Sequence, residues 1–171
     1  MRKMQPARTL GAIAAAAALV AALAPRVSAA TATANLTVSA TVTNNCTVST
    51  NALAFGSYDP VVANAAANLD GTGTLSVACT RGATAVLGLG AGSNSSGSTR
   101  RLTDGAGNYL TYELYSDSGR SNVWNTGGGT FGMTAAPSRA ARDYTVYGRV
   151  QGNQDVPAGT YGDTVVATVN F

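Results

Sequence analysis

The strongest constraint on the fold is the alternation of apolar and polar side chains over residues 34–43. One side of this run is apolar, with Ala34, Leu36, Val38, Ala40 and Val42. The other side is polar, with Asn35, Thr37, Ser39, Thr41 and Thr43. Successive side chains of a β-strand point to opposite faces, so this period of two predicts a strand with one buried side.

Short runs with strand-like composition recur along the rest of the chain, separated by clusters of Gly, Ser, Asn and Asp that predict loops, notably at 90–99 and 125–129. Thr and Val favour strands and Gly favours turns, whereas the helix formers Glu and Lys are nearly absent. The sequence therefore predicts an all-β domain, a sandwich or a barrel. Besides 34–43, the predicted strands are 52–56, 73–80, 83–89, 109–116, 121–124, 129–134, 143–151 and 161–171.

The first 29 residues have the pattern of a secretory signal peptide. Basic residues precede an apolar run at 10–24, and small residues follow at 27–30. The run is too short and too rich in Ala for a membrane span, so we expect none in the mature chain. We expect a mature, exported chain that begins near Ala30 or Thr31.

Removal of the signal changes the charge balance. The whole chain has eleven basic and eight acidic residues, and the signal takes Arg2, Lys3, Arg8 and Arg26 with it. Seven Arg then face eight acidic residues, a net charge of about −1, which gives no support to a nucleic-acid or anionic-membrane partner.

Catalytic chemistry is poorly served by the residues that remain. The mature chain has no His, no Lys and a single Glu, Glu113. Ser-His-Asp and Cys-His catalysis, Schiff-base chemistry and His-ligated metal sites are therefore excluded. We expect no enzyme activity, no cofactor and no metal site.

Two cysteines, Cys46 and Cys79, remain in a chain bound for an oxidising compartment. Such a pair predicts one disulfide. Closing a loop of this length should stabilise the fold by about 3–4 kcal/mol. Asn44 and Asn45, directly before Cys46, predict a turn or a bend within a longer strand.

Three further patterns have an ordinary explanation beside a functional one. Asn68–Gly73 and Asp104–Asn108 carry oxygen ligands beside Gly, but Asp-Gly and Asn-Gly turns explain both better than calcium loops. Arg100–Arg101 and Arg139–Arg142 are expected to be solvated loop charges or exposed ion pairs. Aromatic residues could line a sugar-binding face, but core packing and cross-strand pairing explain them without a ligand: Tyr109, Tyr112, Tyr115 and Trp124.

An ordered series of motifs resembles the spore coat protein U domain family, which includes subunits of archaic chaperone–usher pili such as Csu-type pili. The resemblance covers essentially the whole mature chain. Its motifs are Asn45-Cys-Thr-Val48, Phe55-Gly-Ser-Tyr-Asp-Pro60, Leu75-Ser-Val-Ala-Cys-Thr-Arg-Gly82, Tyr109-Leu-Thr-Tyr-Glu-Leu-Tyr-Ser-Asp117, Tyr144-Thr-Val-Tyr-Gly-Arg149 and the C-terminal run Pro157–Phe171.

The resemblance implies an immunoglobulin-like β-sandwich that lacks its last strand and is completed by donor-strand complementation. It further implies a surface pilus subunit, exported through the periplasm, whose partners are a periplasmic chaperone, an outer-membrane usher and neighbouring subunits. Adhesion and biofilm formation would be its role. A secreted or coat-associated sandwich that completes its own fold, and a carbohydrate-binding module, stay open as alternatives.

The resemblance also divides the chain. Residues 1–29 would be the signal, 30–44 an extension holding the donor strand, and 45–171 the pilin domain. The donor side chains would be Leu36, Val38, Ala40 and Val42. The edge that meets the chaperone or the donor would carry Val165, Ala167, Val169 and Phe171, packed against the core.

Overall fold

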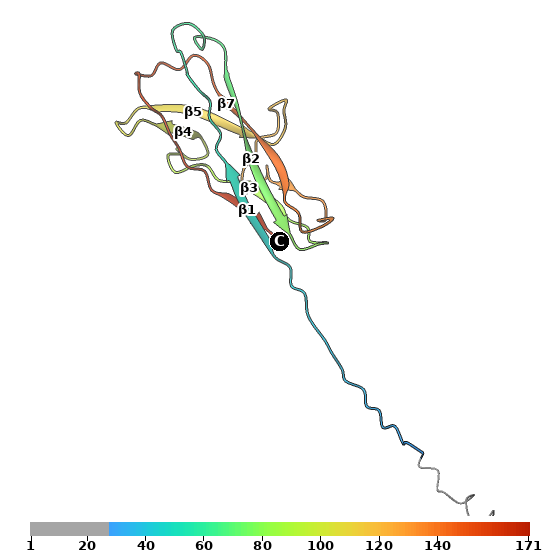
Figure 1. Cartoon of the computed structure of the whole chain (residues 1–171). Coiled ribbons are helices and arrows are strands. Elements are labelled where there is room, and N and C mark those ends of the chain that lie inside the picture. The colour runs from blue at the N-terminus through green and yellow to red at the C-terminus, as the bar shows by residue number, and fades with distance from the viewer. Residues whose placement is uncertain (1–27) are drawn as a thin grey trace, which may run out of the picture. The chain divides into compact units, whose positions relative to one another are not determined.

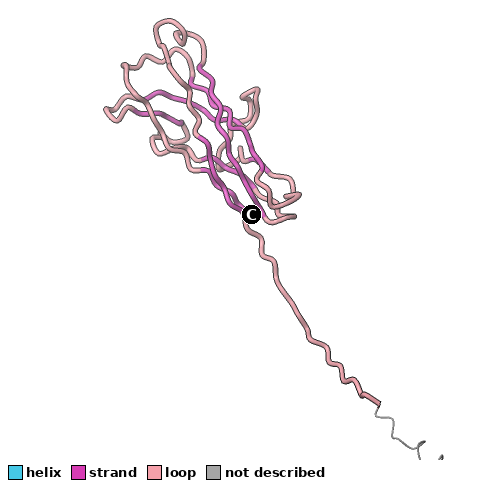
Figure 2. Tube along the Cα trace, viewed as in Figure 1, coloured by secondary structure: helices cyan, strands magenta, loops and turns pink. Residues whose placement is uncertain are grey.

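A computed structural model describes residues 28–171, and the predicted signal peptide lies almost entirely outside this range. The chain separates into two units between Ala40 and Thr41. Residues 28–40 form no strand and are exposed throughout. Residues 41–171 contain eight strands, and within the described residues there is no helix (Figure 2). The all-β prediction is confirmed.

Five strands form the larger sheet, in the order β1-β2-β7-β5-β4, and all neighbours are antiparallel (Figure 1). The alternation of side chains sets which residues face the core: in β2, Leu75, Val77 and Cys79 are buried and the residues between them are not. The strands are β1 (Cys46–Asn51), β2 (Leu69–Cys79), β4 (Arg100–Thr103), β5 (Tyr109–Tyr115) and β7 (Arg142–Val150).

Three short strands form the second sheet, in the order β6-β3-β8. They are β3 (Val86–Leu89), β6 (Phe131–Gly132) and β8 (Ala167–Asn170). Leu87 of β3, fully buried, shares one hydrophobic core with Leu75, Leu114 and Val150 of the larger sheet. Two sheets that enclose one core make a β-sandwich, as predicted.

The predicted disulfide is present. Cys46 and Cys79 face each other as the first pair of the β1–β2 ladder, and their sulfur atoms are bonded. The bond therefore ties the first strand of the domain to the start of the turn that follows β2.

Several local predictions are wrong. Residues 34–43 form no strand, since no residue of this segment takes part in a ladder within the described residues 28–171. Segments 52–56 and 121–124 likewise form no strand, apart from an isolated bridge at Val123. Asp70 and Gly71, expected in a turn, lie inside β2, whereas the turn at Asp104–Asn108 is confirmed by the bond from the Asp104 amide to the Asn108 carbonyl.

Of residues 28–171, none belongs to a helix long and apolar enough to cross a membrane.

Candidate functional site

Each sheet ends in two edge strands, and β1 and β8 are the edge strands that lie at the border between the sheets. Within the described residues, β1 pairs only with β2, and β8 pairs only with β3. The two strands nevertheless lie beside each other at the border between the sheets, where Figure 1 shows the red C-terminal strand next to β1. An unpaired edge presents a row of free N–H and C=O groups, which is a template for an added strand.

A long apolar groove runs between these edges and the segments that continue them. One cavity of about 700 Å³ lies between residues 53–60 and 156–163. A second, of about 400 Å³, lies between residues 50–55 and 163–167. Both cavities are lined by Leu53, Phe55, Leu102 and Asp163, so they form one groove, whose walls are residues 50–58 and 156–167.

The groove exposes the hydrophobic core on one side. Its floor includes fully buried core residues such as Leu75 and Val150, while the walls are only half-buried. On β1, Val48 faces the same way as Cys46 and opposes the buried Val77, yet it is 40% exposed. The half-buried hydrophobic residues along the groove are Leu53, Phe55, Tyr58, Leu69, Leu102, Val156, Tyr161, Val165 and Ala167.

Three glycines on the inner face of the larger sheet let the first wall of the groove lie flat on that sheet. A Cβ at Gly73 would stand 2.9 Å from the Leu53 Cβ, and a Cβ at Gly148 would stand 2.8 Å from ring atoms of Phe55. A Cβ at Gly71 would stand 3.1 Å from a side-chain atom of Phe55 and 3.2 Å from a side-chain atom of Leu53. Leu53 and Phe55 therefore occupy the space where side chains of β2 and β7 would otherwise project.

Asp163 is the only charged residue that lines either cavity of the groove, among the described residues. Its Oδ2 accepts a hydrogen bond of 2.7 Å from the Tyr112 hydroxyl, and its Oδ1 accepts bonds from the backbone and side-chain nitrogens of Asn94. Burial, together with this hydrogen bond, raises the pKa of Tyr112 above its usual range. Gly92, at φ +91°, makes room for the carboxylate, since a Cβ there would stand 2.0 Å from Oδ2.

Of the predicted acceptor residues, Val165 and Ala167 line the C-terminal wall of the groove, whereas Val169 and Phe171 lie beyond it. Val165, Ala167 and Val169 are half-buried and pack against the core. Phe171 is 56% exposed, so the prediction that its ring packs against the core is wrong for the chain by itself. Phe171 follows the end of β8, a strand that has a ladder partner on one side only within the described residues.

The predicted donor side chains are exposed. Leu36, Val38 and Val42 are 87%, 83% and 83% accessible, and Ala40 is exposed as well. A row of large, solvent-exposed apolar side chains in one extended segment is unusual in a folded monomeric protein. The sequence analysis does not predict that Leu53, Phe55 and Tyr161 line a groove. The glycines of β2 and β7 that face Leu53 and Phe55 are the sequence feature that could have indicated the first two residues.

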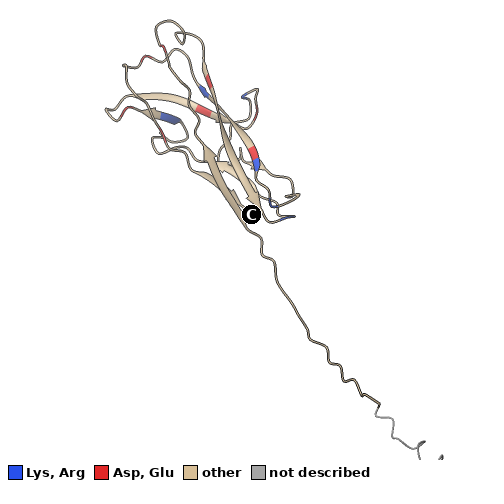
Figure 3. Ribbon diagram, viewed as in Figure 1, with Lys and Arg blue, Asp and Glu red and all other residues tan. Residues whose placement is uncertain are grey.

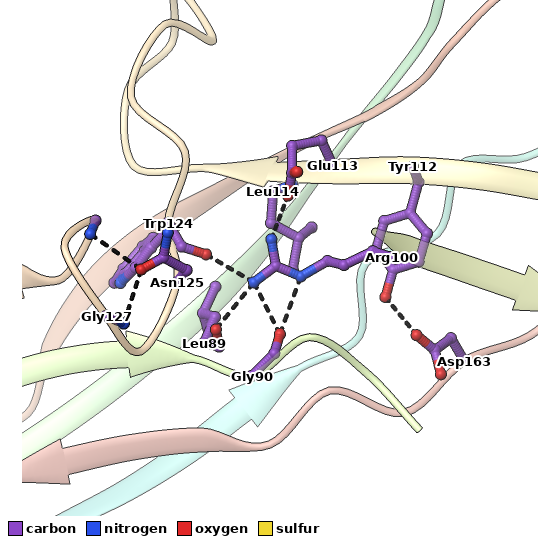
Figure 4. Close-up of polar contacts among 11 residues, drawn as sticks. Leu89, Gly90, Arg100, Tyr112, Glu113, Leu114, Trp124, Asn125, Gly127 and Asp163 are labelled. Carbon is purple, nitrogen blue, oxygen red and sulfur yellow. Dashed lines mark hydrogen bonds and ion pairs between the residues drawn. The ribbon is translucent and has the colours of Figure 1, made fainter. Parts of the chain in front are cut away.

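A second buried polar cluster corrects the prediction for Arg100. Its side chain is 2% exposed and lies inside the sandwich instead of in solvent. Nε donates to the Gly90 carbonyl at 2.9 Å, and Nη2 donates to the carbonyls of Leu89 and Trp124 at 2.9 and 2.8 Å (Figure 4). Nη1 pairs with the Glu113 carboxylate. The guanidinium thus holds together β4, β5, β3 and the segment at Trp124.

The aromatic residues considered for sugar binding do not form one exposed surface. Trp124 is 1% exposed, and its indole nitrogen donates to the Leu87 carbonyl at 3.1 Å. Tyr112 and Tyr115 are buried, and Tyr109 lies under the Arg101 guanidinium, 4.0 Å from the ring centre. In the described part of the chain, no group of three or more His, Cys, Asp or Glu side chains could hold a metal ion.

Comparison with known proteins identifies the class of domain. The family model described as Spore Coat Protein U domain matches residues 32–168. The chain therefore belongs to the Spore Coat Protein U domain family. It is 45% identical over 128 residues to "Protein U" of Myxococcus xanthus, an alignment that covers 70% of this chain and 71% of that protein.

The fold is also similar to that in a crystal structure of the CsuC–CsuE chaperone–tip adhesion subunit pre-assembly complex from archaic chaperone–usher Csu pili of Acinetobacter baumannii. The TM-score is 0.58 at 19% sequence identity, and the match covers 77% of this chain. This chain spans 41% of the matched chain. At this identity the similarity concerns the fold.

Proposed function

We propose that this chain is a non-enzymatic structural subunit of a surface pilus, assembled by the chaperone–usher route through donor-strand exchange. The observation that carries the proposal is the groove between residues 50–58 and 156–167. An opened core flanked by two unpaired strand edges is completed when an extended segment from another molecule adds to the sheet.

Residues 34–42 have the properties of that added strand. At about 3.3 Å per residue they span about 30 Å when extended. No residue from 28 to 58 carries a charge, as Figure 3 shows, so the segment brings no ion into an apolar groove. Leu36, Val38, Ala40 and Val42 enter the groove, and main-chain bonds to β1 and β8 hold the strand.

The proposed assembly route also implies the partners. A periplasmic chaperone covers it after export, an outer-membrane usher exchanges that chaperone for the next subunit, and the finished fibre stands on the cell surface. Val165, Ala167 and Val169 form the accepting wall, and the exposed ring of Phe171 is covered by the incoming partner. Adhesion and biofilm formation follow from such a fibre. The similarity of the fold to a pilus subunit bound to its chaperone supports this proposal.

A coat-associated sandwich that closes its own groove is the second candidate. The family description, Spore Coat Protein U domain, and the 45% identity to "Protein U" favour it. In that case residues 34–42 would fill the groove of their own chain, and the protein would be a stable monomer.

A donor peptide tests whether residues 31–44 fit the groove, and the full-length protein separates the two candidates. Purified exported chain lacking residues 31–42 is mixed with a synthetic peptide of residues 31–44, and with the same peptide carrying Leu36→Asp as a matched control. Because a ligand that binds only the folded state raises its melting temperature, the native peptide should stabilise the domain and the control should not. Full-length protein should give filaments and heat-resistant ladders. A full-length monomer that forms neither contradicts the pilus proposal.

A further inference from the structure

The start of β1 is held by one side chain from the strand beside it. Thr80 follows β2, and its amide donates to the Asn45 carbonyl at 2.8 Å, which extends the β1–β2 ladder by one residue. In return the Asn45 amide donates to the Thr80 Oγ1 at 3.1 Å. The same hydroxyl donates to the Thr43 carbonyl at 3.1 Å, and the Asn45 carbonyl is a second, more distant acceptor at 3.4 Å. A hydroxyl has one proton to give and can also accept, so this arrangement uses both functions of Thr80.

The Thr80 hydroxyl accepts the hydrogen bond that the Thr80 carbonyl would accept in a regular ladder. In an antiparallel ladder the Asn45 amide would bond to the carbonyl of Thr80. That carbonyl instead accepts from the Ala83 amide at 3.0 Å, in a turn that Gly82 makes possible with φ +86°. The chain therefore leaves the ladder at Thr80. Of the four hydrogen-bond contacts that join residues 43–45 to Thr80, three use its hydroxyl and would be lost without it.

Residues 43–45 are the place where the chain could turn back along β1. Asn44 and Asn45 are residue types that tolerate the two positive φ angles of a two-residue hairpin turn. In such a turn the Thr43 carbonyl would accept from the Cys46 amide, and residues 34–42 would fold back along the free edge of their own β1. In residues 28–171 only Arg120 and Asn153 have positive φ among residues other than Gly, so Asn44 and Asn45 form no such turn.

We propose that Thr80 is a positioning residue that keeps residues 43–45 in line with β1, so that the donor segment is offered to a second copy of the chain instead of closing its own groove. The proposal rests on the proposed function. Thr80 holds the Thr43 carbonyl that the hairpin would need, and it thereby disfavours self-complementation.

The test compares three variants of the full exported chain. Thr80→Val keeps the shape and removes the hydroxyl, Thr80→Ser restores the hydroxyl, and Thr47→Val removes a hydroxyl of β1 that contacts only the Ala78 carbonyl, at 3.5 Å. Two readouts are used: the fraction of monomer on an unheated gel, and binding of the peptide of residues 31–44 by that monomer. Thr80→Val should raise the fraction of monomer that does not bind the peptide roughly threefold or more. Each lost hydrogen bond shifts the equilibrium between the open and the self-complemented chain by about that factor. Thr80→Ser and Thr47→Val should match the wild type.

A second variant tests the same competition without changing Thr80. Asn45→Gly creates the Asn-Gly pair favoured in two-residue hairpins and should also raise the closed monomer. It decides the question if Thr80→Val does not fold. Wild-type assembly by both Thr80→Val and Asn45→Gly would overturn the role of Thr80 and leave the pilus proposal standing. A wild-type chain that neither binds the peptide nor forms a ladder would overturn both proposals.

Discussion

The Tyr112 hydroxyl donates a hydrogen bond of 2.7 Å to the Asp163 carboxylate, and this bond ties the centre of β5 to the segment that leads into β8. Tyr112 is 6% exposed, and Asp163 lines both cavities of the groove. The bond therefore fixes one wall of the groove to the core beneath it, at a point that the strand ladders do not connect.

Loss of this bond should weaken the domain in a pH-dependent way. Tyr112→Phe should lower the free energy of unfolding by about 1–2 kcal/mol at pH 7, because Asp163 Oδ2 loses the Tyr112 donor. The pKa of Tyr112 is raised in the folded state, so the neutral phenol stabilises the fold below the usual tyrosine pKa of about 10, and that contribution is lost as the pH rises above it. Urea unfolding should show that the difference in the free energy of unfolding between wild type and Tyr112→Phe is smaller at pH 11 than at pH 7.

Tyr109→Phe is the matched control for this titration. Tyr109 is 41% exposed, so Tyr109→Phe should leave the free energy of unfolding at pH 7 unchanged. A difference between wild type and Tyr112→Phe that is the same at both pH values would contradict the assignment.

Removal of Arg100 should be among the most damaging single changes in the chain. The side chain is 2% exposed and satisfies the carbonyls of Leu89, Gly90 and Trp124. Arg100→Ala leaves these groups and Glu113 without their partner, and should cost about 3–5 kcal/mol by denaturant unfolding. Arg100→Lys should recover little, because an ammonium cannot reproduce the planar fork.

The neighbouring arginine provides the comparison for Arg100. Arg101 is half-buried and lies over the ring of Tyr109, so Arg101→Ala should cost about 1 kcal/mol or less. Equal losses for Arg100→Ala and Arg101→Ala would mean that the buried network contributes nothing of its own.

A methyl group at Gly73 should displace the first wall of the groove. The new Cβ would stand 2.9 Å from the Leu53 Cβ and 3.2 Å from the Asn51 carbonyl oxygen, neither of which is the end of a flexible side chain. Gly73→Ala should therefore cost about 1–3 kcal/mol and weaken binding of the peptide of residues 31–44. Gly132→Ala, where nothing lies within 4 Å, should do neither. Thermal unfolding with and without peptide measures both effects.

The sequence predicts the strands whose alternation is visible locally. In the predicted strand 109–116, alternation puts Leu110, Tyr112 and Leu114 on one face, and all three are buried. Strand β4 is not predicted, because Arg100 in the sequence has the character of a solvated charge. The groups that bind the buried Arg100 side chain, on Leu89, Gly90, Glu113 and Trp124, come from other segments of the sequence. Asp70 and Gly71 have turn composition but lie in β2, where Arg149 pairs with Asp70 across the ladder at 2.7 Å.

The groove could be expected only from resemblance to a family. Composition and periodicity do not indicate that a sandwich lacks a strand, because the strands that are present have the same alternation of apolar and polar residues whether or not another strand is missing. The identity of the groove residues depended on tertiary packing: Leu53 and Phe55 lie on Gly73 and Gly148, which come from two different strands.

The most direct test of the pilus proposal is fibre growth by a full-length chain that carries Leu36→Asp, compared with Asn35→Asp one residue away. Leu36 is 87% exposed in the chain, so its replacement should leave the melting temperature of the domain unchanged. A charge at this position of the donor would enter a neighbour's apolar core at a cost of several kcal/mol, whereas the side chain of Asn35 faces outward. Electron micrographs should show filaments for wild type and Asn35→Asp and none for Leu36→Asp. Normal filaments from Leu36→Asp, or loss of its folded domain, would contradict the donor role of residues 34–42.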